Sequence, residues 1–400
     1  MGNYMASTSI HATGQPASVP PASERYIGEL DGVRAVAVGI VVCAHYHLIP
    51  YIPGGFGVTL FFFLSGYLIT TLFYAEYKST HDVSIPRFYL RRWLRLTPPL
   101  IISIVLGNIF YHQTRYSVGS DPVPIGTTLA ALFYYMNYYA LFFDLDPDKM
   151  TPFGINWSLA IEEHFYLIWP LIIRKNIRKS DSLFLIVLGL CLTVLLWRMI
   201  ARFDLHLSVA YTYLATDCRI DSILYGALLR ILFETRWAGA AVRVLSSRTC
   251  QISAILVLFA SFIIRDDDFR ETIRYSLHGL VLMPLFTLVL VGDPKSLLRR
   301  ALSNAPMVLI GRLSYSIYLF HLMARTPAEA YFGTPFGIGP TLFGLALTGA
   351  LAYTIFILVE RPLARLRHRF RSESPSERRA GPIATPMEAS IGRLPEGSTD

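Results

Sequence analysis

The stretch FGVTLFFFLSGYLITTLFYAE, residues 56–76, contains a single charged side chain, Glu76. A helix needs about 20 apolar residues to cross a bilayer, so this stretch predicts a transmembrane helix. Similar apolar segments recur along the chain, at 33–52, 56–76, 96–111, 126–143, 155–173, 181–200, 220–235, 250–264, 273–291, 307–323 and 338–359. The sequence therefore predicts an all-α fold, a polytopic bundle of transmembrane helices.

The composition indicates the same class of protein. Of the 400 residues, 53% are hydrophobic and 16% are charged, whereas about 25% of the residues of a soluble domain are charged. These proportions argue against a soluble enzyme, a fibrous protein and a largely disordered chain. The formal net charge of +8 would suggest nucleic acid in a soluble protein, but membrane proteins concentrate Lys and Arg in cytoplasmic loops. We therefore expect membrane lipid around the chain and no nucleic-acid partner.

The basic residues are clustered, and the clusters predict the topology. Two of them, in 78–95 and 174–179, should both be cytoplasmic. Three apolar segments lie between these clusters, so one of the three cannot cross. The segment 126–143, which Asn137 interrupts, is the weakest, and we expect it to be re-entrant or interfacial. About ten crossings remain, and both termini are then cytoplasmic.

The two ends of the chain differ in composition from the middle. Residues 1–24 are rich in Ser, Ala and Pro, which is typical of a disordered leader. Residues 364–400 are first basic and then polar, so we expect a cytoplasmic tail. Between them, 25–363 should form one membrane domain.

Ionisable side chains at membrane depth are costly and usually mark a site. His45 follows Arg34 by eleven residues, a spacing that turns an α-helix by about 1100° and advances it by about 16 Å. The two side chains therefore share one helix face, with His45 deep in the membrane. Glu162 and Glu163 reach a similar depth in the predicted topology, so either could orient the imidazole in a general-base pair. Structural roles, as a buried histidine or an arginine-paired glutamate, remain open.

Other charged residues suggest binding sites. Arg92 and Arg95 precede a predicted span on its cytoplasmic side, where they could bind the phosphates of a ligand such as coenzyme A or anionic lipid. Arg219 and Asp221, on the outer side, could bind an acceptor or form a structural ion pair. His321 could contact an acceptor or lie at the membrane interface. The four cysteines lack metal-ligand spacing, so we expect no metal site.

Seven runs of sequence occur in the order typical of one family. They are LDGVRAVAVGIVVCAH (30–45), GVTLFFFLSGYLI (57–69), FYLRRWLRLTPP (88–99), NWSLAIEEHFYLIWP (156–170), RIDSILYGALL (219–229), IGRLSYSIYLFH (310–321) and VERPL (359–363). In these runs the chain resembles the acyltransferase 3 family of integral membrane O-acyltransferases, the bacterial type that acylates surface sugars. The resemblance covers about 26–363.

The resemblance implies an activity and a set of site residues. An Arg-x10-His motif, here Arg34 and His45, would supply a histidine essential for acyl transfer, either as a general base on the acceptor or as a transient carrier of the acyl group. An Arg-x-x-Arg motif, here Arg92 and Arg95, would handle acyl-CoA, and Arg34 would hold the phosphates of the donor together with these two arginines. The run 157–163 would belong to the active core. The expected reaction moves an acyl group, most simply acetyl from acetyl-CoA, to a hydroxyl of a lipid-linked or polymeric sugar such as an exopolysaccharide. The expected location is the bacterial inner membrane.

Two residues depart from the family pattern. Thr59 stands where the family often has an acidic or other polar residue, and His164 stands where glutamine is usual. Neither belongs to the two arginine motifs, so we expect these residues to affect the choice of acceptor rather than acyl transfer.

Other functions remain open at the level of sequence. The same chemistry could acylate a small secondary metabolite such as a macrolide sugar. A proton-coupled transporter would also have many spans and buried ionisable groups, although we see no internal repeat of the kind common in transporters. A non-catalytic membrane scaffold would tolerate substitution of His45 or Arg34. The sequence does not indicate an oligomeric state.

Overall fold

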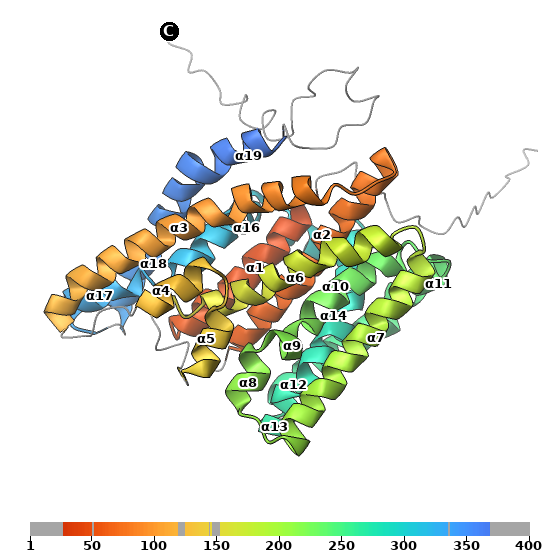
Figure 1. Ribbon diagram of the computed structural model, residues 1–400, viewed down its shortest axis with the longest axis horizontal. Coiled ribbons are helices and arrows are strands. Elements are labelled where there is room, and N and C mark those ends of the chain that lie inside the picture. The colour runs from red at the N-terminus through yellow and green to blue at the C-terminus, as the bar shows by residue number, and fades with distance from the viewer. Residues whose placement is uncertain are drawn as a thin grey trace, which may run out of the picture.

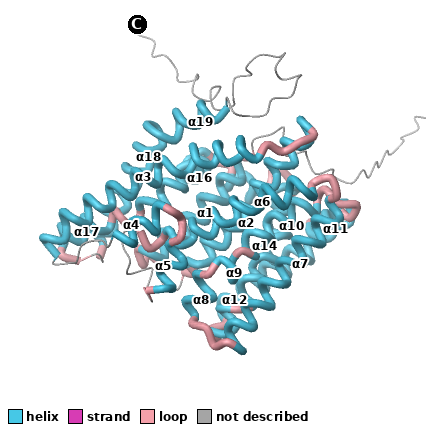
Figure 2. The backbone as a smooth tube through the Cα atoms, viewed as in Figure 1, coloured by secondary structure: helices cyan, strands magenta, loops and turns pink. Residues whose placement is uncertain are grey.

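The computed structural model describes residues 27–49, 52–118, 125–143, 145, 153–334 and 337–368. Within these ranges every regular element is a helix and there is no strand (Figures 1 and 2), which confirms the all-α prediction. The predicted leader 1–24 lies outside the described ranges, and so does the predicted tail beyond residue 368. The last described helix continues past the predicted end of the membrane domain at Leu363.

The helices range from four to 34 residues in length. Two of them, η1 and η2, are single π-helical segments that continue an α-helix. In chain order the elements are α1 (Gly28–His45), α2 (Gly54–Thr80), α3 (Ile85–Val118), α4 (Ile125–Leu132), α5 (Met136–Phe142), α6 (Asn156–Asn176), α7 (Ser180–Met199), η1 (Ile200–Asp204), α8 (Val209–Leu214), α9 (Thr216–Arg219), α10 (Asp221–Leu232), α11 (Ala238–Leu245), α12 (Arg248–Ile263), α13 (Asp267–Glu271), α14 (Ile273–Val291), α15 (Leu297–Leu302), α16 (Ala305–Phe320), α17 (Arg325–Phe332), α18 (Ile338–Ile355), η2 (Phe356–Glu360) and α19 (Arg361–His368).

Five described stretches are long and apolar enough to cross a membrane: α2, most of α3, α7 with η1, α14, and α18 with its continuation into α19. Two bent helix pairs, α11 with α12 and α16 with α17, raise the number to seven if each pair is one span. The protein is thus built as an integral membrane helical bundle. The prediction of about ten crossings also counts α1, α6 and α10, but α1 and α6 carry charged side chains and α10 has only 12 residues.

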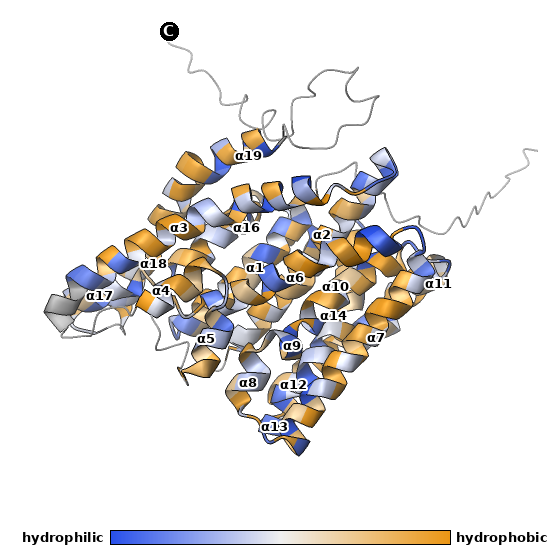
Figure 3. Ribbon diagram, in the orientation of Figure 1, coloured by the Kyte–Doolittle hydropathy of each residue, from blue (hydrophilic) through white to orange (hydrophobic). Residues whose placement is uncertain are grey.

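The outer helices present the apolar surface that lipid requires. In Figure 3, α7 is apolar along much of its length. Large apolar side chains are exposed there, including Leu185 and Leu196, and also on α18, including Leu342. Soluble proteins rarely expose contiguous apolar surface on this scale. By contrast α10 is buried along nearly its whole length, so its polar residues are shielded from lipid by neighbouring helices.

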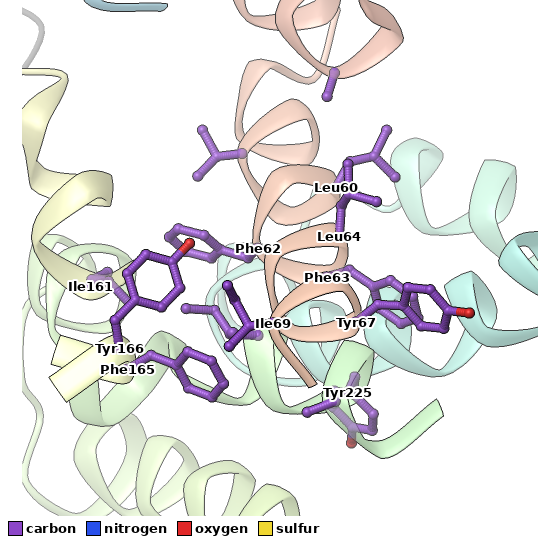
Figure 4. Packing of buried hydrophobic residues seen from close by; sticks show 14 of the residues in the cluster. Leu60, Phe62, Phe63, Leu64, Tyr67, Ile69, Ile161, Phe165, Tyr166 and Tyr225 are labelled. Atoms are coloured by element: carbon purple, nitrogen blue, oxygen red, sulfur yellow. The ribbon is translucent and has the colours of Figure 1, made fainter. Parts of the chain in front are cut away.

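Glycines allow the central helices α2 and α10 to touch. A Cβ atom on Gly66 would lie 1.9 Å from the carbonyl oxygen of Ile223, and one on Gly226 would lie 1.8 Å from that of Phe63. Small residues at such crossings let helix backbones approach closely in membrane proteins. Aromatic and aliphatic side chains of α2, α6 and α10 fill the core around this crossing (Figure 4). The bundle therefore has a tightly packed centre.

The segment 126–143 is broken, as we expect for a stretch that does not cross, but the break falls at Tyr134 and not at Asn137, which lies inside α5. Helices α4 and α5 have eight and seven residues, and Tyr134 between them has a φ of 56°. Neither helix approaches the length of about 20 residues that a simple crossing needs. Helix α5 packs against α6 and α8, so protein covers part of this irregular backbone, as is required at membrane depth.

Candidate active site

Two helices end at the predicted catalytic histidine. His45 is the last residue of α1, and α16 ends at Phe320, directly before His321. The Nδ1 atom of His45 lies 2.9 Å from the Nε2 atom of His321. Helices α16 and α17 are bent by 59° at this point, so the histidine pair lies at a break in a long helix. Backbone groups freed by such a break need polar partners in a membrane protein.

Side chains bound to the backbone of the two helix ends hold the pair in place. The Tyr46 hydroxyl donates a hydrogen bond to the carbonyl oxygen of His321 over 2.8 Å. Arg325 donates to the carbonyl oxygen of His45 over 3.0 Å. The His321 side chain is fully buried, whereas His45 is only partly buried. The more accessible imidazole is therefore the one that the Arg-x10-His motif singles out.

The hydrogen bonds of His321 determine which nitrogens carry hydrogen. Its Nδ1 atom lies 2.7 Å from the carbonyl oxygen of Tyr318. A carbonyl oxygen can only accept, so this Nδ1 atom must carry the hydrogen. In a neutral His321 the Nε2 atom then has the lone pair and accepts from Nδ1 of His45. The lone pair of a neutral His45 therefore lies on its Nε2 atom, in the form that a general base requires.

A cavity among α1, α2, α3, α6 and α16 contains the predicted donor-binding arginines. Arg34, Arg92 and Arg95 line it together with Val58 and Tyr318. The helix directions place the arginines at one end, because Arg34 is eleven residues from the end of α1 that carries the histidine. His45 is not among the lining residues. Since the carbonyl oxygen of Tyr318 accepts from His321, the histidine pair lies just behind the other end of the cavity.

The three arginines differ in their partners. Arg34 makes an ion pair with Asp31 at 3.1 Å. The guanidinium of Arg92 lies 4.9 Å from the centre of the Tyr166 ring, in a cation–π contact. Within the part of the chain that the structure describes, neither Arg92 nor Arg95 makes an ion pair. Their charge is thus only partly balanced, which suits an anionic ligand.

The two glutamates occupy different positions. Glu162 lines the cavity, and its carboxylate accepts hydrogen bonds from Ser65 over 3.1 Å and from Tyr166 over 2.9 Å. Glu163 is not among the lining residues. The structure places His321 against the His45 ring, and a glutamate that orients His45 stays a prediction. In the described ranges no group of three or more His, Cys, Asp or Glu side chains could hold a metal ion.

Arg219 and Asp221 are both fully buried, but they do not pair with each other. Asp221 forms a two-pronged ion pair with Arg198, at 2.9 and 3.2 Å, and also accepts from Ser276 over 2.7 Å. This arrangement favours the ion-pair alternative for Asp221. Arg219 instead stacks on the ring of Tyr275, at 3.8 Å from its centre.

The two residues that depart from the family pattern are both engaged in polar contacts. Thr59 accepts a hydrogen bond from Arg219 over 3.2 Å. The Nδ1 atom of His164 lies 2.7 Å from the hydroxyl oxygen of Thr216, and Asn137 donates a hydrogen bond to the same oxygen over 3.0 Å. Through Thr216, His164 connects α6 to α9 and to the broken segment 126–143. The sequence alone did not predict this connection.

Several polar residues of the site were missed at the level of sequence. Three of them line the cavity: Ser65, Tyr166 and Tyr318. Each is a polar residue inside an apolar run, and this position was the signal that could have identified it. Arg198 was missed although it is a charged residue inside the apolar segment 181–200. An arginine in such a position is a signal of a buried polar partner.

The sequence as a whole matches a known family. The family described as "Acyltransferase domain" matches residues 27–359, a range that contains both histidines, the three cavity arginines and both glutamates. The chain belongs to the acyltransferase 3 family. This match confirms the family resemblance that the seven sequence runs indicated.

Curated acyltransferase 3 relatives carry acetyltransferase names. The chain is 29% identical over 365 residues to peptidoglycan O-acetyltransferase OatA of Listeria monocytogenes, which covers 86% of this chain and 56% of the relative. It is 31% identical over 372 residues to O-acetyltransferase OatA of Staphylococcus aureus, which covers 86% of this chain and 58% of the relative. The chain therefore spans somewhat more than half the length of these relatives. No solved structure matches it.

Proposed function

We propose that this acyltransferase 3 protein is a membrane O-acetyltransferase that moves an acetyl group from cytosolic acetyl-CoA to a hydroxyl of a surface glycan. The observation that carries the proposal is the hydrogen-bonded pair of His45 and His321 just behind the end of an arginine-lined cavity. The names of the relatives support acetyl as the acyl group. A polymeric or lipid-linked sugar, of the class to which peptidoglycan belongs, is the acceptor we propose.

In this proposal His45 acts as the general base. Its Nε2 atom takes the proton of the acceptor hydroxyl while the hydroxyl oxygen attacks the thioester carbonyl. The tetrahedral intermediate then expels the thiolate of coenzyme A, and the imidazolium returns the proton to that thiolate. The atoms balance as one ester formed and one thiol released.

His321 positions the base. By accepting from Nδ1 of His45, it keeps the lone pair of the base on Nε2, and this hydrogen bond strengthens when His45 becomes charged. We propose this positioning role for His321 in place of the direct acceptor contact that the sequence suggested. The carbonyl oxygen of Tyr318 fixes His321 in turn.

Arg34, Arg92 and Arg95 would bind the phosphate groups of the donor. Arginine binds phosphate through paired hydrogen bonds, and Arg92 and Arg95 have no ion pair among the described residues. The pantetheine arm of the donor would follow the cavity towards Tyr318. Glu162, which lies in the same cavity, would orient the arginines. Glu163 does not line the cavity, but its negative charge would partly offset the positive charge of Arg92.

The acceptor would approach from the opposite end of the cavity. Thr59 and Arg219 lie behind that end, joined by their hydrogen bond, and Arg219 stacks on Phe62, which lines the cavity. We propose that these residues shape the acceptor end, while Asp221 holds the surrounding helices together.

The proposed orientation places the arginines at the cytoplasmic face of the bacterial inner membrane. It includes α1, α6 and α10 among ten crossings, with 126–143 as a re-entrant or interfacial segment and both termini in the cytoplasm. Cytosolic acetyl-CoA and an acceptor on the outer side then reach the histidine pair from opposite ends.

Substitution of His45 tests the proposal. Cells that lack the gene are complemented with the wild type, with His45→Ala or with the control His47→Asn, and the surface glycan is analysed by mass spectrometry for O-acetyl groups. His47 is exposed and has a positive φ that asparagine tolerates. We expect His45→Ala to remove the acetyl groups and His47→Asn to retain them at equal protein levels. Acetylation by the His45→Ala protein would contradict the proposal.

A further inference from the structure

The C-terminal helix α19 lies beside the arginine end of the cavity. It follows the π-helical segment η2, which ends at Glu360, and it packs against α3, the helix that carries Arg92 and Arg95 (Figure 1). The carboxylate of Glu360 accepts a hydrogen bond from Ser316 of α16. This hydrogen bond fixes the start of α19 to a helix that itself lines the cavity.

Arg367 faces the same side of this segment as Glu360. Seven residues separate them, and seven residues turn an α-helix by about 700°, within about 20° of two full turns. The charges of Glu360 and Arg95 both act on Arg367, and Arg34 also acts on Glu360. The side chain of Arg367 is partly buried, in contrast to the exposed Arg365 on the same helix.

The charges around this point do not balance. Arg367 makes no ion pair with any residue that the structure describes, and the same is true of Arg92 and Arg95. Arg34 is paired with Asp31. Three guanidinium groups without an ion-paired carboxylate thus gather near one end of the cavity, with Glu162, Glu163 and Glu360 among the nearby acidic groups. Partly buried like charges of this kind repel one another unless an anion joins them.

We propose that Arg367 is a further phosphate-binding residue of the donor site, supplied by α19, and that together with Arg95 it binds the 3′-phosphate of coenzyme A. This inference rests on the proposed function. The 3′-phosphate lies at the end of coenzyme A farthest from the thioester. Arg367 is not itself a lining residue, but it lies near Arg95, which lines the end of the cavity farthest from His45. Glu360 then acts as the counter-ion that keeps the two arginines oriented while no donor is bound.

The test compares Arg367→Gln with the matched control Arg365→Gln, which removes an exposed arginine from the same helix. The full chain is reconstituted in nanodiscs of zwitterionic lipid, and transfer is measured with acetyl-CoA and with acetyl-3′-dephospho-CoA. We expect Arg367→Gln to raise the KM for acetyl-CoA about 10-fold with little change in kcat, and Arg365→Gln to change neither. With the dephospho donor, the wild type and Arg367→Gln should have similar KM values. Arg367→Lys, which keeps the charge, should recover part of the loss.

Other outcomes overturn the inference. An unchanged KM in Arg367→Gln, or an equal effect of Arg365→Gln, would rule out a specific role for Arg367. A defect that appears only in nanodiscs with anionic lipid would assign Arg367 to phospholipid headgroups instead. Binding of coenzyme A, measured by calorimetry on the same samples, must weaken in Arg367→Gln by the same factor as the KM rises. If the wild type itself transfers no acetyl group, the proposed function fails, whereas an active wild type with an unaffected Arg367→Gln variant refutes only this inference.

Discussion

The imidazole of His321 is hydrogen-bonded to that of His45 over 2.9 Å, although 276 residues separate them in the sequence. The contact joins the end of α1 to the break between α16 and α17. It brings the runs 30–45 and 310–321, which lie near the two ends of the family match, to a common location. It also makes the position of the hydrogen on the His45 ring depend on a second, fully buried side chain.

Substitution of His321 should show this dependence directly. Leucine removes the acceptor that holds Nδ1–H of His45, so we expect His321→Leu to lower kcat about 100-fold or more with little change in KM. Glutamine can present a carbonyl oxygen close to the position of Nε2, so His321→Gln should retain more activity. The kcat of both variants, measured against pH with equal amounts of folded protein, checks the prediction. Equal kcat values for the two variants would argue against the positioning role.

The two glutamates should differ in their effect on the donor. Glu162 lines the cavity and accepts hydrogen bonds from Ser65 and Tyr166, whereas Glu163 does not line it. Glu162→Gln should therefore raise the KM for acetyl-CoA more than Glu163→Gln does. Steady-state kinetics of the two variants provide the measurement. A larger effect of Glu163→Gln would reverse the assignment.

The crossing of α2 and α10 should not tolerate a side chain. In Gly226→Val the new Cβ atom meets the carbonyl oxygen of Phe63, so the helices must separate, and we expect a loss of about 1–3 kcal/mol or more. Thermal unfolding in detergent measures the loss. Gly189→Ala is the control, because nothing lies within 4 Å of a Cβ atom at that position, and it should unfold near the wild-type temperature.

The buried pair of Arg198 and Asp221 should behave as a structural element. Asp221→Leu leaves the charge of Arg198 without its partner, which costs about 3–5 kcal/mol. The double variant Arg198→Met with Asp221→Leu removes both charges and should recover most of the stability. Protein yield and thermal unfolding measure both effects. If Asp221→Leu instead folds normally and only raises the KM for the acceptor, Asp221 belongs to the acceptor site.

The sequence predicted the helical bundle and an interruption within 126–143. Long apolar runs indicate membrane-spanning helices, and clustered basic residues indicate cytoplasmic loops. The sequence also marked segments 33–52, 155–173 and 220–235, which correspond to α1, α6 and α10, although the polar side chains or short length of these helices leave them outside the five to seven stretches that are long and apolar enough to cross. These helices pack near the centre of the bundle, where α10 is almost entirely buried. Neighbouring helices, which a sequence pattern does not reveal, make such polar content acceptable.

The sequence predicted which residues belong to the candidate site, but not which of these residues contact one another. Arg34, Arg92 and Arg95 line one cavity, as their positions near the predicted cytoplasmic face suggested, and Glu162 lines it with them. The contact between His45 and His321 was not predicted, because it depends on where α1 and α16 end. Helix ends are set by tertiary packing and are poorly fixed by apolar periodicity, so the two histidines seemed to lie at different depths.

The close approach of α2 and α10 also limits how the protein can change shape. Because the backbones of the two helices touch at Gly66 and Gly226, a sliding motion between them would force main-chain atoms into collision. Any rearrangement that admits a bulky nucleotide must then take place elsewhere. Helix α19 packs against α3 beside the arginine end of the cavity, so we expect opening and closing during turnover to involve this end of the bundle.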